Sequence, residues 1–296
     1  MDDLDFSLPG NKPAPKAAPA APQVPPPKAV YNAAMAMEVF RIAGKAESAA
    51  AGTKFFEEGD KAGFLKRERM FLLLEGEVAM NVKGQPIGVV KVGEIFGEMA
   101  VIADAPRTAT ALAKTSCRVV TLDIKEFHRG LQVKPEFALM LMGMMILRLR
   151  GMLARLAESA LGKSGDIGES SVFDKGMLAS LAKGLGEQGT ANHAAGTVLF
   201  KEGSAGALMY VVLEGRVAVS IKGQVVGRVG PGGMFGEMAL VDQAARTASA
   251  AAETDTTLLA INRTVFMNLV KANPEFGAAL LGAVAKRVRY IAERLK

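Results

Sequence analysis

Short apolar segments separated by glycine-containing turns fill two long stretches of the chain. The first stretch covers residues 52–123 and the second covers residues 196–261, and in both the apolar segments have the length of β-strands. A helical pattern precedes the first stretch, at about residues 31–41. The pattern predicts a small, turn-rich β-barrel that occurs twice.

Helical periodicity follows each set of predicted strands. It covers residues 124–131 and 135–158 after the first set, and residues 263–270 and 274–296 after the second. Pro135 and Pro274 fit the first turn of a helix. The apolar run at 139–147 is too short to span a bilayer, so we expect a buried helix there and no membrane contact. Residues 171–174 resemble a capping box for a further helix.

The two stretches are copies of one another. Residues 96–100 (FGEMA) and 107–109 (RTA) return as residues 235–239 and 246–248 with the same spacing. Further upstream the offset between the copies grows, so the first copy carries about five extra residues within the basic segment 61–69. We expect a surface loop there, because loops tolerate insertions, although its role stays open. An internal repeat of this length predicts tandem domains.

Composition divides the rest of the chain. Residues 9–28 hold eight of the thirteen prolines, so residues 1–30 are predicted to be a disordered tail. Residues 159–170 are polar and rich in glycine and serine, which is typical of a linker. The expected domains are therefore residues 31–158 and 171–296. One cysteine and the absence of a secretory signal favour a cytoplasmic location, whereas the net charge of +6 indicates no particular partner.

The repeated motif combines groups that suit a phosphorylated sugar. A helix that opens at a glycine offers unpaired backbone N–H groups to an anion. An arginine adds a planar set of donors for two phosphate oxygens, and a carboxylate accepts hydrogen bonds from ribose hydroxyls. Both copies contain all three elements.

The order of the motifs EG, LEG, FGEMA and RTA within a glycine-rich barrel, followed by an arginine-rich helix, resembles the cyclic nucleotide-binding domain. This is the domain of catabolite activator protein, of kinase regulatory subunits and of cyclic nucleotide-gated channels. The resemblance covers about residues 35–158 and 171–296. It implies an α+β, mainly β fold of two tandem jelly-roll-like β-barrels, each flanked by N- and C-terminal helices.

The resemblance also assigns roles to matching residues. The glutamates would accept the ribose 2′-hydroxyl, the arginines would pair with the cyclic phosphate, and the backbone around each Gly-Glu-Met would complete the phosphate cradle. The threonine after each arginine would face the phosphate or the base. The implied binding residues are Gly97, Glu98, Met99, Arg107 and Thr108 in the first repeat, and Gly236, Glu237, Met238, Arg246 and Thr247 in the second. Tyr290 is the aromatic candidate for capping the purine.

These features predict an allosteric receptor. We expect cyclic AMP as the ligand, with cyclic GMP compatible, and ligand-driven movement of the C-terminal helices. No output domain is recognisable by residue 296, so we expect the output to pass to an unidentified protein partner, through the N-terminal tail or the terminal helices, or to self-association as a homodimer. The alternatives are an interaction scaffold and a receptor for another nucleotide such as cyclic di-GMP.

Other function classes fit the sequence less well. Enzymes on related barrels use clusters of metal-binding histidines, and this chain has only His128 and His193. We therefore expect neither catalysis nor a bound metal. The basic residues near the C-terminus are expected to form a solvated helix face, which makes DNA an unexpected partner.

Overall fold

The computed structural model describes residues 31–61, 68–158, 171–185 and 189–294. The predicted tail at 1–30, the predicted linker at 159–170 and residues 62–67 of the basic insertion lie outside these ranges.

Among the described residues, each repeat has eight strands arranged as two antiparallel four-stranded sheets. In the first repeat the sheet orders are β1-β8-β3-β6 and β2-β7-β4-β5, and in the second they are β9-β16-β11-β14 and β10-β15-β12-β13. Apolar side chains from both sheets of a repeat meet between them. The mainly β, jelly-roll-like class is thus confirmed, with facing open sheets in place of closed barrels. The strands of the first repeat are β1 Lys45–Ala49, β2 Lys54–Phe56, β3 Arg69–Glu75, β4 Val78–Val82, β5 Gln85–Val90, β6 Ile95–Phe96, β7 Thr110–Ala113 and β8 Cys117–Asp123. Those of the second are β9 Thr190–His193, β10 Val198–Phe200, β11 Met209–Glu214, β12 Val217–Ile221, β13 Gln224–Val229, β14 Met234–Phe235, β15 Ser249–Ala252 and β16 Thr256–Ile261.

Eight helices accompany the strands within the described residues: five lie where helical periodicity predicts them, one follows the predicted capping box and two short ones follow the motif glycines. They are α1 Ala33–Ala43, α2 Glu98–Ala103, α3 Ile124–Val133, α4 Glu136–Glu158, α5 Lys175–Leu185, α6 Glu237–Asp242, α7 Arg263–Ala272 and α8 Pro274–Arg294. Of the predicted capping box at 171–174, only Asp174 caps α5. Its side chain, and not that of Ser171, accepts a hydrogen bond from the Met177 backbone N–H, at 2.7 Å.

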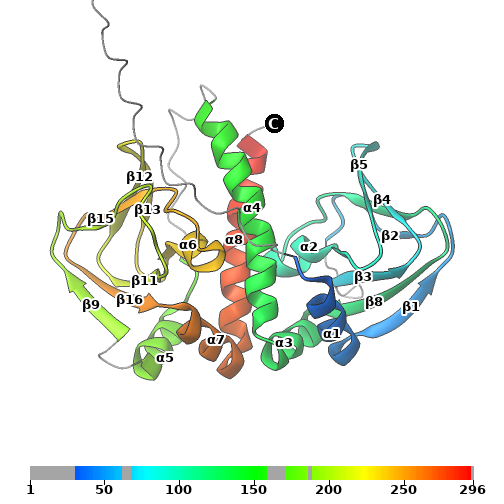
Figure 1. Cartoon of the computed structure of the whole chain (residues 1–296), viewed down its shortest axis with the longest axis horizontal. Helices are drawn as coiled ribbons and strands as arrows, with labels where there is room; N and C mark the ends of the chain where they lie inside the picture. Colours follow the sequence, from blue (N-terminus) through cyan, green and yellow to red (C-terminus); the bar gives the residue numbers. More distant parts are fainter. Residues whose placement is uncertain (1–30, 62–67, 159–170, 186–188, 295–296) are drawn as a thin grey trace, which may run out of the picture.

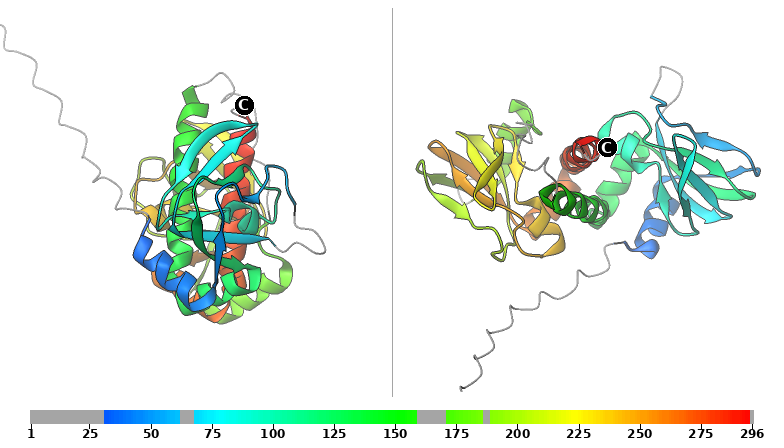
Figure 2. Two further views of the ribbon diagram at one scale, coloured as in Figure 1. Left: turned by 90° about the vertical axis from the view of Figure 1, so that its right-hand side faces the viewer. Right: turned by 90° about the horizontal axis from the view of Figure 1, so that it is seen from above.

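The two long helices α4 and α8 lie side by side in the centre of the molecule, with one β unit on each side (Figures 1 and 2). Each also contacts the other repeat, since α8 packs on α2 and α4 packs on α6. At the contact between α8 and α2 the backbones approach closely, because a Cβ added to Gly282 would lie 3.1 Å from the carbonyl oxygen of Ile102. The apolar side chains of both repeats consequently form one continuous core around this helix pair.

The apolar run at 139–147 lies in this core. Its side chains are buried except for Met144, which is half-buried, and Leu147, which is exposed. The expectation of a buried helix is therefore confirmed. Among the described helices, none alone has the length and apolarity to cross a membrane; α3 and α4 as far as Met152 meet that test of length and composition only as a pair bent by 112°.

Removing side-chain volume from the helix pair should destabilise both repeats. Leu280 of α8 is fully buried in the shared core, so Leu280→Ala should lower the free energy of unfolding by about 2–5 kcal/mol through lost burial and a residual cavity. Leu147→Ala, an exposed leucine on α4, is the matched control and should change it by no more than about 0.5 kcal/mol. Urea titration followed by circular dichroism measures both; equal values for the two variants would contradict the shared core.

Candidate functional site

Each repeat has a pocket beside the start of its short helix, α2 or α6. The first pocket has a cavity of about 520 Å³ and the second one of about 120 Å³. The structure brings all five predicted residues of each repeat to the lining of that repeat's own pocket. The first pocket contains Gly97, Glu98, Met99, Arg107 and Thr108, and the second contains Gly236, Glu237, Met238, Arg246 and Thr247.

Glycine is required at the N-terminus of α2 and of α6. Gly97 and Gly236 adopt left-handed backbone conformations, with φ of 72° and 77°. There is also no room for a side chain, because a Cβ on Gly236 would lie 2.7 Å from Nη1 of Arg246 and one on Gly97 would lie 2.9 Å from Nη1 of Arg107. The motif glycine thus allows the backbone and the arginine to meet.

The two arginines lie inside the protein. Arg107 and Arg246 are only 7% and 6% exposed, and each donates a hydrogen bond from Nη1 to the carbonyl of the motif glycine, at 2.7 and 2.8 Å. Each guanidinium also covers a phenylalanine ring, at 4.2 Å from the ring centroid for Phe56 and 4.1 Å for Phe200. A cation over an aromatic face is held in place by attraction to the ring.

The surroundings of the arginines differ between the repeats. Nη2 of Arg107 forms an ion pair with Glu68 at 2.5 Å and donates to the carbonyl of Arg69 at 2.8 Å. Burial lowers the pKa of Arg107, and the carboxylate of Glu68 opposes that shift. Burial likewise lowers the pKa of Arg246, whose Nε is buried and has no hydrogen-bond partner among the described residues. The second pocket therefore contains a buried cationic donor that is incompletely satisfied.

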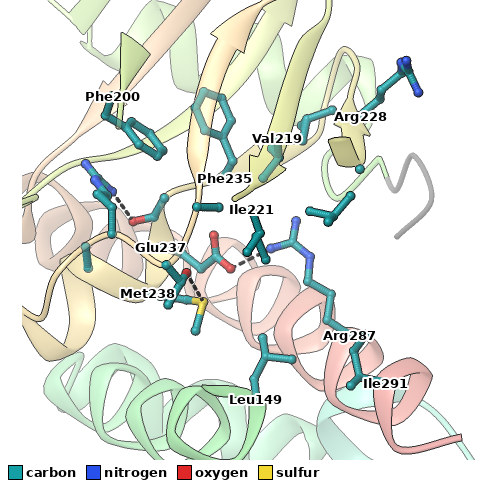
Figure 3. Close-up of a pocket in the computed structure, with 18 residues that line it drawn as sticks. Leu149, Phe200, Val219, Ile221, Arg228, Phe235, Glu237, Met238, Arg287 and Ile291 are labelled. Atoms are coloured by element: carbon teal, nitrogen blue, oxygen red, sulfur yellow. Dashed lines mark hydrogen bonds and ion pairs between the residues drawn. The ribbon is translucent and has the colours of Figure 1, made fainter. Parts of the chain in front are cut away.

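The two glutamates are buried as well, and each is met by an arginine from the long helix of its own repeat. Glu98 is 7% exposed and Glu237 is 3% exposed. Arg287 of α8 pairs with Glu237 at 2.6 Å (Figure 3). It also donates to the carbonyl of Met234 at 2.7 Å. Arg148 of α4 pairs with Glu98 at 3.4 Å. The long helices thus reach the carboxylates of the motif.

Several residues of the site are absent from the sequence prediction. Phe56 and Phe200 occupy equivalent positions in the two copies, and so do Arg148 and Arg287, so comparison of the copies contained a signal for them. Glu68 has no acidic counterpart in the second copy, where Ala207 occupies the equivalent position, and only the fold places it beside Arg107.

Three further groups clarify the chemistry of the site. Tyr290, the candidate purine cap, lines a different cavity beside Ala103 and Asp104 of the first repeat. Thr247 donates a hydrogen bond to the sulfur of Met238 at 3.5 Å, and both residues line the second pocket. In the part of the chain that the structure describes, no group of three or more His, Cys, Asp or Glu residues is placed to hold a metal ion.

The family profile described as "Cyclic nucleotide-binding domain" matches residues 46–133 and 191–273. The cAMP-dependent protein kinase regulatory subunit of Pyricularia oryzae is 27% identical over 190 residues, covering 63% of this chain and 43% of that protein. The Cyclic AMP receptor protein of Thermus thermophilus is 36% identical over 99 residues, covering 32% of this chain and 46% of that protein. The crystal structure of Thermus thermophilus Catabolite Activator Protein is 30% identical over 43% of this chain and 62% of that chain, with a TM-score of 0.38. The chain spans less than half the length of these two curated relatives.

Breaking the buried ion pair of the first pocket should destabilise the protein. Glu68→Gln leaves the guanidinium of Arg107 buried without its carboxylate, so the free energy of unfolding should fall by about 3 kcal/mol. Glu75→Gln breaks the exposed pair between Arg118 and Glu75 and serves as the control, with an expected loss of no more than about 1 kcal/mol. Chemical denaturation compares the variants, and a loss for Glu68→Gln no larger than the control would show that the pair contributes little.

Proposed function

The chain belongs to the cyclic nucleotide-binding domain family, and from this we propose that it is a cyclic AMP receptor with one ligand site in each repeat. The observation that carries the proposal is that both pockets contain a buried arginine and a buried glutamate beside a helix that begins at a glycine. We assign the sites to domains at residues 31–158 and 171–296.

The residues suit the parts of a cyclic nucleotide. In the second pocket, a phosphate would supply the negative charge and the acceptor oxygen that Nε of Arg246 lacks. In the first pocket, Arg107 would bind the phosphate. Glu98 and Glu237 would accept the ribose 2′-hydroxyl. The apolar part of the second pocket, which includes Val219 and Ile221, would receive the base.

Cyclic AMP is our choice of base because two relatives carry it in their names, a cAMP-dependent protein kinase regulatory subunit and a Cyclic AMP receptor protein. Cyclic GMP is the alternative, since another similar protein is a cGMP-dependent protein kinase of Caenorhabditis elegans, 25% identical over 75% of this chain and 26% of that protein. Both nucleotides present the same phosphate and ribose to the residues assigned here.

We propose that binding moves the long helices. The carboxylate of Glu237 would accept hydrogen bonds from two groups, the guanidinium of Arg287 and the ribose hydroxyl of the ligand. Ligand binding would therefore change the contact between Glu237 and α8. Arg148 and Glu98 provide the same connection between α4 and the first pocket. A ligand shifts such an equilibrium by its difference in affinity for the two states. A partner protein that recognises one position of the helices would receive the signal.

Calorimetric titration with cyclic AMP tests this function. The parent protein should show two sites, and Arg107→Ala or Arg246→Ala should each weaken one of them roughly 10- to 150-fold, which is the loss of a charged hydrogen bond worth about 1.5–3 kcal/mol. Arg118→Ala, which removes an exposed arginine in β8, is the control and should bind as the parent does.

Titrations with cyclic GMP and cyclic di-GMP separate the alternatives. Tighter binding of cyclic GMP would change the assigned base and leave the site as proposed. Binding of cyclic di-GMP alone would replace the ligand class. If none of the three binds, the two repeats are better described as a protein-interaction scaffold.

A further inference from the structure

We propose that the ring of Tyr31 contacts the ligand of the first site, which gives that site a contact from the segment before α1 that has no counterpart in the second site. The inference deepens the proposed function and rests on it in taking a cyclic nucleotide as the ligand. Three observations support it: the place of Tyr31 in the pocket lining, the hydrogen bond that fixes its ring, and the different position of the equivalent residue in the second repeat.

Tyr31 directly precedes the N-cap of α1 and lines the first pocket. It is far from the FGEMA and RTA motifs in the sequence, yet the fold places it in the lining of the cavity that contains Glu98 and Arg107. The residue is half-buried, because one part of it packs on the shared core while another part lines the cavity. With a volume of about 520 Å³, that cavity has the size of pockets that hold small molecules. A ligand in it would therefore meet the ring of Tyr31.

A hydrogen bond fixes the ring of Tyr31 in the wall of the pocket. Its hydroxyl donates to the carbonyl of Gly93 at 2.5 Å. Gly93 lies in the turn between β5 and β6, and this turn is itself bonded to β3. The Gly93 N–H donates to the Leu73 carbonyl at 2.8 Å, and the Leu73 N–H donates to the Glu94 carbonyl at 3.1 Å. The ring is thus held in position before a ligand arrives, which lowers the entropic cost of the contact.

The hydroxyl of Tyr31 stays protonated, so this hydrogen bond persists across the physiological pH range. Burial raises the pKa of Tyr31, and the negative charges of Glu94 and Glu98 raise it further. Both glutamates also line the first pocket. Because Glu98 is the carboxylate that we assign to the ribose hydroxyl, we place the ring at the ribose side of the ligand, where its apolar face would cover the sugar.

The equivalent aromatic residue of the second repeat, Phe173, has a different position. Tyr31 directly precedes Asn32, whose side chain caps α1, and Phe173 directly precedes Asp174. The side chain of Asp174 caps α5 in the same way. The ring of Phe173, however, is 2% exposed and stacks on Phe276, with 5.4 Å between the centroids. Among the described residues, the lining of the second pocket does not include Phe173.

The turn beside each ring shows how the two positions arise. Gly232 is the counterpart of Gly93 in the second repeat. Its carbonyl accepts hydrogen bonds from the backbone N–H groups of Val172 and Phe173, at 2.8 and 3.0 Å. In the first repeat the phenol of Tyr31 donates to this carbonyl instead. The aromatic side chain therefore lies at the turn and the pocket in the first repeat, whereas it lies in the core in the second.

Calorimetric titration in an Arg246→Ala background tests the affinity of the first site in the full chain. There, Tyr31→Ala should raise the Kd for cyclic AMP by about tenfold, because the contact with the ring is lost. Tyr31→Phe keeps the ring and should raise the Kd by no more than about threefold. Tyr290→Ala removes an exposed tyrosine that lines a different cavity, so this matched control should stay within about twofold. Thermal unfolding of each variant checks that the protein is folded.

A fluorescence measurement distinguishes contact from a purely structural role of Tyr31. The chain contains no tryptophan, so Tyr31→Trp introduces a single fluorescent reporter in the pocket wall. A bound ligand covers the ring, so cyclic AMP should lower the quenching of its emission by acrylamide about twofold. The decrease should persist in an Arg246→Ala background. It should be absent in an Arg107→Ala background at the concentration that saturates the intact first site.

The outcomes separate this inference from the proposed function. An unchanged Kd in Tyr31→Ala, or weaker binding without protection of the reporter, would overturn the contact. The receptor assignment would still stand if Arg107→Ala weakens binding. Weaker binding in Tyr31→Ala together with protection of the reporter would support the contact. If the parent protein binds neither cyclic AMP nor cyclic GMP, the proposed function is wrong and the Tyr31 contact is overturned with it.

Discussion

The packing of α4 against α8 is the interaction on which the rest of the structure depends. Each of these helices is apolar over more of its circumference than one repeat can cover, so each buries the excess against the other helix and against the short helix of the opposite repeat. The result is one shared core around the helix pair, in addition to a smaller apolar cluster between the sheets of each repeat. Because protein interiors are close-packed, a displacement of either long helix changes the packing of both β units.

This arrangement brings the buried charges of the site within reach of the helices. A carboxylate and a guanidinium taken out of water destabilise the fold unless nearby groups compensate for the lost hydration. The first repeat supplies such compensation to Arg107 through Glu68, and both repeats supply it to the motif glutamates through Arg148 and Arg287. Arg246 contacts a phenylalanine face and donates to one glycine carbonyl, and its Nε has no hydrogen-bond partner among the described residues.

The inequality of the pockets has a simple origin in the sequence. Directly before β3 the first repeat has Glu68 beside Arg107, whereas the second repeat has Ala207 at the equivalent position. The packing of the helices adds a second difference. Leu149 of the first repeat lines the second pocket, whereas no described residue of the second repeat lines the first pocket. Two copies of one motif thus lie in different surroundings while keeping the same glycine, glutamate and arginine.

Much of the local structure, and the residues that line the two pockets, could be predicted from the amino-acid sequence. Glycine-punctuated apolar segments predicted the strands, helical periodicity placed α3, α4, α7 and α8, and the repeated FGEMA and RTA motifs named residues that the fold brings together in two pockets. These features follow from short-range geometry, which a linear pattern records. The tertiary structure alone decided that Tyr290 lines a different cavity, that Glu68 meets Arg107 and that a side chain of α4 lines the second pocket. Such contacts join residues that are distant along the chain, and they depend on how two apolar helix faces pack, which periodicity does not specify.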